Sequence, residues 1–311
     1  MAEFPTGYVV RSPATRDAAA IADVVQALDV ADFGEPDFSE QDLLDDWMRP
    51  RFELLTDSWV LNGPTGRVIG YAYVWEAQPG REIEGDAFVL PEYSGRGLGS
   101  QFLDLMETRA REICGGRQLS MGVFASSANE DKRNLLERRG FTVSRSVLRL
   151  RIDLNREAID ESDAPPGVEI RSVELADEDA VRAVWLDAFA SHGRFSSRRM
   201  EEWLQSRFDH PAFDPSLWRV AVLDGQIVGT ILVFDVGQTG YTSTVGVRAE
   251  ARGRGIGPAL LRAAFGALRD RGQMRAIVSL DADTEPGLLA LYEAGGMRLH
   301  ERHDLFSKPL T

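Results

Sequence analysis

Residues 252–257 read Arg-Gly-Arg-Gly-Ile-Gly, between a strand-like stretch at 241–247 and a helix-like stretch that begins at Pro258. Glycines at alternate positions let the backbone come close to a ligand. The first N–H groups of the following helix have no partner inside the helix, and the helix dipole favours a phosphate at that end. Strand, glycine turn and helix together therefore predict a site for a phosphate-bearing ligand.

Two other phosphate-binding patterns do not fit this turn. The dinucleotide fingerprint Gly-x-Gly-x-x-Gly, counted from Gly255, needs a glycine where Leu260 stands. The P-loop pattern needs Gly-Lys-Ser/Thr, which does not follow here. The alternative to a phosphate site is a tight turn that only caps the helix. That alternative does not explain the two arginines of the turn.

The chain repeats this arrangement. Arg11 recurs as Arg171, Gly70 as Gly229 and Gly97 as Gly255, at separations of 160, 159 and 158 residues. A strand–turn–strand pattern precedes the glycine turn in each half, and Asp224-Gly225 is a strong hairpin signal in the second. The steady offset indicates a duplicated domain. We expect domains at 1–158 and 168–311, joined by a linker at 159–167 that contains two prolines.

The glycine turn resembles the acetyl-CoA motif of the GNAT superfamily, Arg/Gln-x-x-Gly-x-Gly/Ala, with Arg252, Gly255 and Gly257 at the motif positions. The tandem layout most resembles the mycothiol synthase-like branch. The resemblance implies an α/β (α+β) fold of two tandem GNAT-like domains, each a mixed, mostly antiparallel sheet flanked by helices. It implies acetyl-CoA as co-substrate and no metal.

The same resemblance assigns the cofactor contacts. In the second half they are Val245, Gly246 and Val247 for the pantetheine arm, and Arg252, Gly253, Arg254, Gly255, Ile256, Gly257 and Pro258 for the pyrophosphate. In the first half the corresponding residues are Val89, Leu90, Gly95, Arg96, Gly97, Leu98, Gly99 and Ser100.

The two halves differ at the position of the expected acid. Leu291-Tyr292-Glu293 is similar to the family's small helix, whose tyrosine gives a proton to the departing CoA thiolate. In the first half Leu136 stands at that position, and Ser94 replaces Arg252. We therefore expect catalysis in the second domain and a non-catalytic first domain, which binds cofactor without turnover, shapes the acceptor cleft or serves as scaffold.

An amine acceptor must lose a proton before it attacks, so a base or a water relay is needed. Asp281, at the end of a predicted strand, is the first candidate base, followed by Asp235 and His192. The expected reaction is acetyl transfer to a primary amine of a small molecule by direct attack. Alternatives are a mycothiol synthase acting on a cysteinyl amine, protein acetylation, and a non-catalytic acyl-CoA-binding sensor.

The composition of the chain limits which classes of partner and which cellular compartment we expect. The net charge of −14 repels nucleic acid and suits a cationic acceptor. There is no long apolar run and no secretory signal, and Cys114 is the single cysteine, so we expect a cytoplasmic protein without a membrane contact. We expect a monomer or a homodimer, and Cys114 as a packing residue.

Overall fold

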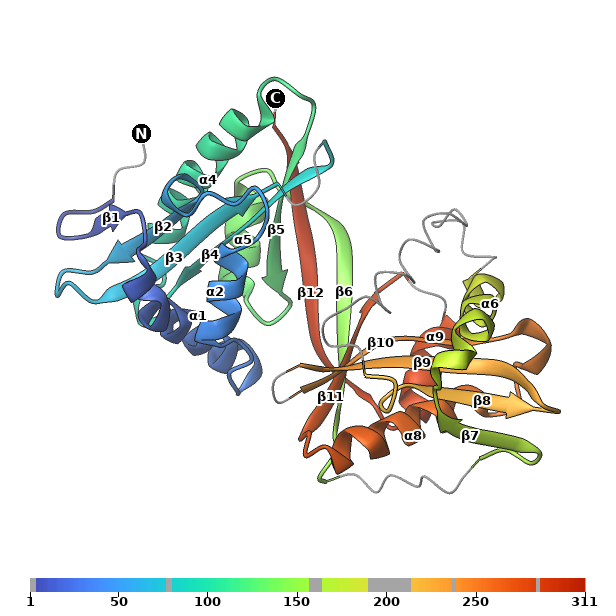
Figure 1. The fold of residues 1–311 in the computed structure, drawn as a ribbon. Helices are drawn as coiled ribbons and strands as arrows, with labels where there is room; N and C mark the ends of the chain where they lie inside the picture. The colour runs from blue at the N-terminus through green and yellow to red at the C-terminus, as the bar shows by residue number, and fades with distance from the viewer. Residues whose placement is uncertain are drawn as a thin grey trace. The chain divides into compact units, whose positions relative to one another are not determined.

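The computed structural model describes residues 4–76, 80–156, 164–189, 214–236, 239–283 and 286–310 (Figure 1). The chain forms two compact units. The first contains Met1–Val147 together with Glu301–Thr311, and the second contains Leu148–His300. These bounds differ from the expected division at 158 and 168. The difference arises because strand pairing decides which unit a segment joins: residues 303–309 pair with β5 and so belong to the first unit.

The first unit is a mixed sheet with helices on both faces. Its strands are β1 (Val9–Arg11), β2 (Ser58–Asn62), β3 (Val68–Trp75), β4 (Glu82–Val89), β5 (Ser120–Ser126) and the first part of β6 (Thr142–Asp153). Its helices are η1 (Thr15–Asp17), α1 (Ala18–Phe33), α2 (Glu40–Trp47), α3 (Leu54–Asp57), η2 (Pro91–Tyr93), α4 (Leu98–Cys114) and α5 (Glu130–Arg138). Neighbouring strands β1 to β4 pair antiparallel, whereas β4 and β5 pair parallel.

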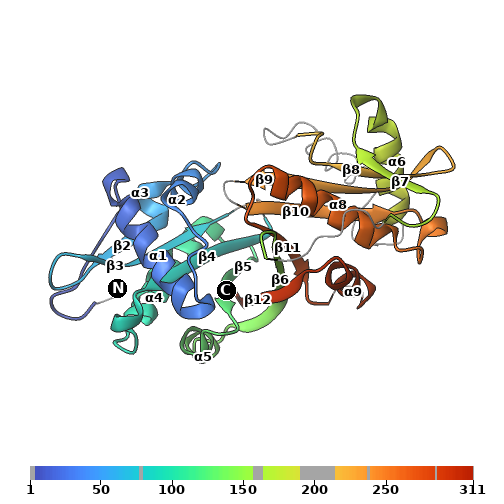
Figure 2. The same ribbon diagram turned by 90° about the horizontal axis from the view of Figure 1, so that it is seen from below.

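The second unit repeats this plan. Its strands are the end of β6, β7 (Val168–Ser172), β8 (Arg219–Leu223), β9 (Gln226–Val236), β10 (Thr239–Val247), β11 (Arg275–Asp281) and the start of β12 (Arg298–Pro309). Its helices are η3 (Leu175–Asp177), α6 (Glu178–Phe189), η4 (Ala249–Ala251), α8 (Ile256–Asp270) and α9 (Pro286–Ala294). Strands β7 to β10 are antiparallel neighbours and β10 pairs parallel with β11. Figure 2 shows α8 lying along strands β9 and β10 of this unit.

Equivalent side chains confirm the duplication. Arg11 holds Asp17 with two hydrogen bonds of 2.7 and 2.8 Å, and Arg171 holds Asp177 with two of 2.6 and 2.9 Å. Each pair fixes the turn between the first strand of a unit and its first long helix. The predicted hairpin turn is also confirmed, since Asp224 and Gly225 have φ values of 50° and 76°.

Helices cover both faces of the first sheet. A Cβ atom on Gly70 would lie 2.9 Å from Cε2 of Phe102 on α4. The neighbouring Tyr71 accepts a 2.9 Å hydrogen bond from Nε1 of Trp47 on α2. Because successive strand residues point to opposite faces, α4 and α2 lie on opposite sides of β3. Cys114, at the end of α4, is buried, which confirms it as a packing residue.

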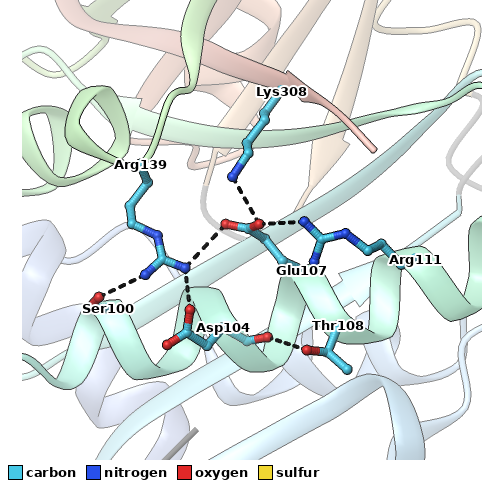
Figure 3. A network of polar contacts seen from close by, with 7 residues as sticks. All are labelled: Ser100, Asp104, Glu107, Thr108, Arg111, Arg139 and Lys308. Atoms are coloured by element: carbon cyan, nitrogen blue, oxygen red, sulfur yellow. Dashed lines mark hydrogen bonds and ion pairs between the residues drawn. The ribbon is translucent and has the colours of Figure 1, made fainter. Parts of the chain in front are cut away.

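The last strand, β12, completes the first unit. Residues 303–309 pair antiparallel with β5, and Phe306 and Leu310 are buried in its core. Figure 3 shows the polar contacts that hold this strand: Lys308 Nζ and Arg111 Nη2 each lie 2.9 Å from Oε2 of Glu107 on α4. Arg139 contacts Glu107 as well. The strand is thus secured by apolar packing and by a buried carboxylate that three cations share.

A helix that crosses a membrane must be both long and apolar. Among the residues described, no helix combines the length and the apolar character needed to cross a bilayer.

Candidate active site

The parallel strand pair of each unit separates part of the way along. In the first unit β4 pairs with β5 only from Glu82 to Gly85. In the second, β10 pairs with β11 only from Thr239 to Tyr241. Beyond these points the main-chain groups of β4 and β10 on that side have no strand partner in the ladder. The gap leaves edge donors and acceptors available to an extended ligand.

The glycine turns follow directly. Gly253 and Gly255 have φ values of 75° and 78°, and Gly95 and Gly97 have 73° and 78°. These left-handed conformations favour glycine. The third glycine has another role, since a Cβ on Gly257 would lie 2.5 Å from Cδ1 of Leu291 on α9. The first glycines shape the turn, and the last lets the long helix pack against the small one.

The helix that follows each turn offers main-chain donors. Gly97 and Gly255 are the N-caps of α4 and α8, and the first helical bonds come from Gln101 and Ala259. The intervening N–H groups have no partner within the helix. Pro258 lacks an N–H, whereas Ser100 at the equivalent position of α4 has one. Both turns therefore suit an anion, and the first has one more main-chain donor.

The arginines of the turns bind main chain and aromatic groups. Arg252 Nε lies 3.1 Å from the Val247 carbonyl oxygen, and its Nη2 lies 3.1 Å from the Ala188 oxygen. Arg96 contacts the Tyr8 hydroxyl at 3.2 Å and stacks over the Tyr93 ring at 4.9 Å. Arg252 thus joins the end of β10 to α6, which positions the turn. Arg254 is exposed.

A cavity of about 400 Å³ opens at the gap of the first unit. It reaches from the glycine turn to α5, and Ala87, Val123 and Leu136 supply apolar lining. Of the site residues expected in this half, those on the cavity wall are Val89, Gly95, Gly97, Leu98, Gly99 and Ser100. Leu90 is buried in the core. The volume lies within the range of small-molecule sites.

Strand β10 of the second unit carries an irregularity that β4 lacks. Its register with β9 shifts between Thr242 and Thr244, so one residue is extra, whereas β3 and β4 pair without a shift. A Cβ on Gly240 would meet Leu268 of α8, but a Cβ on Gly246 would meet Trp185 of α6. The bulge therefore reverses the side-chain alternation just before the glycine turn. Bulges of this kind often re-aim side chains beside active sites.

Tyr292 lies on α9 and is 2% exposed. Burial raises the pKa of its phenol above the ordinary value, and the nearby Tyr241 acts in the same direction. Its side chain makes no hydrogen bond within the part of the chain that the structure describes. The phenol is thus kept protonated and has its donor available, which a general acid requires.

The candidate bases occupy different surroundings. Asp281 ends β11 and is half-buried. Asp235, on β9, accepts a hydrogen bond from Gln273 Nε2. His192 lies outside the described residues.

Sequence reasoning missed two features beside the gaps. The Thr242 hydroxyl, at the bulge, is buried without a hydrogen-bond partner among the described residues. In the first unit Lys132 of α5 forms an ion pair with Asp86 of β4. Lys132 could have been noticed from composition, because the chain has only two lysines. Nothing in the sequence signals the Thr242 environment, which arises from the bulge.

Comparison with known proteins agrees with this geometry. The model of the acetyltransferase (GNAT) family matches residues 22–141 and 178–297. A mycothiol acetyltransferase of Streptomyces bingchenggensis is 30% identical over 86% of this chain and 85% of its own length. One of Cellulomonas flavigena is 30% identical over 90% of this chain and 83% of its own.

Solved structures give the same result. A GCN5-related N-acetyltransferase from Sphaerobacter thermophilus is 29% identical with a TM-score of 0.79, and the match covers 99% of this chain and 97% of that one. A tandem GNAT protein from the clavulanic acid biosynthesis pathway shares the fold at 18% identity and a TM-score of 0.67, over 98% and 99% of the two chains. Since the family model matches both halves, this chain belongs to the acetyltransferase (GNAT) family and carries its domain twice.

Proposed function

We propose that the second unit of this acetyltransferase transfers an acetyl group from acetyl-CoA to the primary amine of a small molecule. One observation carries the assignment to this unit: the strand gap, the glycine turn and a buried tyrosine whose pKa is raised occur together there. The first unit has Leu136 in place of Tyr292, and its β4 pairs with β3 without the register shift that β10 shows against β9.

The residues of the second unit fit an extended, phosphate-bearing cofactor. Glycine conformations at Gly253 and Gly255 leave room for a pyrophosphate against the N–H groups of Ile256 and Gly257. The edge of Val245, Gly246 and Val247 has no strand partner in the β11 ladder and suits an amide-containing arm, with the Val247 carbonyl oxygen already accepting from Arg252. The Thr242 hydroxyl close by has no hydrogen-bond partner among the described residues. Acetyl-CoA supplies the activated acyl group when it is bound.

Side chains of the protein carry out the proton transfers of the reaction. Tyr292 gives its phenolic proton to the leaving sulfur, and its raised pKa keeps that proton in place at neutral pH. A main-chain N–H near Val245 stabilises the developing oxyanion. Asp281 accepts the proton of the incoming amine, directly or through one water.

The curated relatives favour a particular acceptor as a second candidate. Two proteins named mycothiol acetyltransferase align over most of their length with this chain. This supports acetylation of a cysteinyl amine. A non-catalytic acyl-CoA-binding role is the alternative for the first unit, whose cavity keeps the glycine turn without the tyrosine.

Calorimetric titration with acetyl-CoA and thiol release with a panel of amines test the proposal. Binding together with amine-dependent thiol release supports an enzyme. Binding without release from any amine, cysteinyl compounds included, would leave the sensor role. Absence of binding would remove both.

A further inference from the structure

Lysine is rare in this chain. Lysine and arginine together number 35, yet only Lys132 and Lys308 are lysines. Arginine supplies most of the cations in the ion pairs of the described residues. A lysine differs from arginine in having an amine that, once deprotonated, is a nucleophile.

Lys132 lines the cavity of the first unit. Its Nζ forms an ion pair with Oδ1 of Asp86 and lies 5.3 Å from the centre of the Phe88 ring. The two charged side chains are only 18% and 15% exposed. Asp86 follows Gly85, the last residue of β4 that pairs with β5. The amine thus lies where the strands have just separated, held by a carboxylate and facing an aromatic ring.

These contacts are those expected of a bound acceptor. A carboxylate and an aromatic face are common ligands of an ammonium group, and a carboxylate is one of the side chains that act as a general base. Burial raises the pKa of Asp86, although Lys132 opposes this, so the carboxylate is a stronger base than an ordinary aspartate.

We propose that Lys132 is itself an acetyl acceptor, modified by acetyl-CoA held in the cavity of the first unit. The inference rests on the proposed binding of acetyl-CoA by this family, extended here to the first unit. It assigns that unit a single self-directed transfer in place of turnover on a free amine.

The step balances without a further reactant. Asp86 takes one proton from the Lys132 ammonium, and the freed Nζ forms a bond to the acetyl carbonyl carbon. The carbon–sulfur bond breaks, the sulfur leaves with its electron pair as a thiolate, and the second amine proton passes to solvent. Leu136 cannot protonate the thiolate, but a thiol with a pKa of about 8.5 is a tolerable leaving group without an acid. The transfer should therefore be slow and stop after one acetyl group.

Lys308 serves as an internal control for lysine acetylation that does not depend on the cavity. It is similarly shielded, at 24% exposure, and is also paired with a carboxylate, Glu107. It does not line the cavity. A purely chemical reaction with acetyl-CoA would not select Lys132, whereas a reaction inside the cavity would.

The test is incubation of the full chain with acetyl-CoA, followed by peptide mass spectrometry of both lysines. We expect Lys132 to approach one acetyl group per chain and Lys308 to stay at least tenfold lower. Asp86→Asn should slow the reaction at least tenfold, Lys132→Arg should abolish it, and excess CoA should compete.

Calorimetric stoichiometry on the same sample separates the two proposals. Two cofactor sites with unmodified Lys132 would overturn the self-acetylation and leave the proposed function standing. Equal labelling of both lysines, or labelling of Lys132 that excess CoA does not slow, would overturn it as well. One site, with no label on Lys132, would also overturn the self-acetylation, and absence of any site would remove the proposed function as well.

Discussion

Replacing Tyr292 by phenylalanine removes one hydroxyl from a side chain that is 2% exposed. If this hydroxyl protonates the leaving thiolate, kcat should fall at least 100-fold, the lower end of what a general acid contributes. That corresponds to about 2.7 kcal/mol of activation free energy. The free energy of unfolding should change by less than about 0.5 kcal/mol, because the hydroxyl has no hydrogen-bond partner to lose among the described residues.

The assay is thiol release from acetyl-CoA at saturating amine, with thermal unfolding measured alongside. Tyr241→Phe is the matched control, since Tyr241 is the tyrosine that acts on the pKa of Tyr292, and it should keep most of the activity. A Tyr292→Phe enzyme within threefold of the parent rate would refute the assignment and with it the ranking of the two units.

The pKa of Tyr292 also predicts a pH dependence. Because the folded pKa lies above the ordinary value of about 10, the acid stays protonated through neutral and mildly alkaline pH. The rate should therefore rise with pH as the amine acceptor loses its proton, with no descending limb from Tyr292 below about pH 10. A pH–rate profile that falls between pH 7 and 9 would contradict this.

Three further predictions concern stability. Glu107→Gln should lower the free energy of unfolding by about 2 kcal/mol in a denaturant titration, because its buried carboxylate balances Lys308 and two arginines; a change below about 0.5 kcal/mol would contradict this. Gly257→Ala should lower the melting temperature while Gly99→Ala stays near neutral, since the added Cβ would lie 2.5 Å from a leucine carbon in the first case and 3.1 Å in the second; equal shifts would count against it. Asp17 and Asp177 have lowered pKa values because each accepts hydrogen bonds from an arginine. Their contribution to the free energy of unfolding is therefore present above about pH 4 and is lost as the pH falls through the folded pKa. Acid unfolding of Asp17→Asn should accordingly show a weaker dependence of stability on pH.

The sequence predicted the local features well. Asp224-Gly225 forms the predicted hairpin turn, and each glycine turn lies directly before a long helix, as expected. Local steric rules decide these features, so a short stretch of residues contains the necessary information. The duplication was readable for the same reason, because each half repeats the same local signals.

Long-range pairing was beyond the reach of the sequence. Nothing in residues 301–311 shows that they pair with β5, because strand partners are chosen by the whole sheet. The bulge at Thr242 and Thr244 and the Asp86–Lys132 ion pair likewise depend on neighbours distant in sequence. Which side chains meet at the gap could therefore be learned only from the structure.

The return of the last strand has a consequence for how the protein is made. A ribosome completes residues 1–147 long before residues 301–311, which pair with β5 and seal the core of the first unit. Until then the β5 edge, with Val123 and Phe124, lacks that partner, and an uncovered strand edge is prone to wrong pairing. The first half to be synthesised should thus be the last to reach its final stability. A cut at one point between the halves would not release two self-sufficient proteins, so gene duplication here produced an architecture that no longer separates into its two ancestral parts.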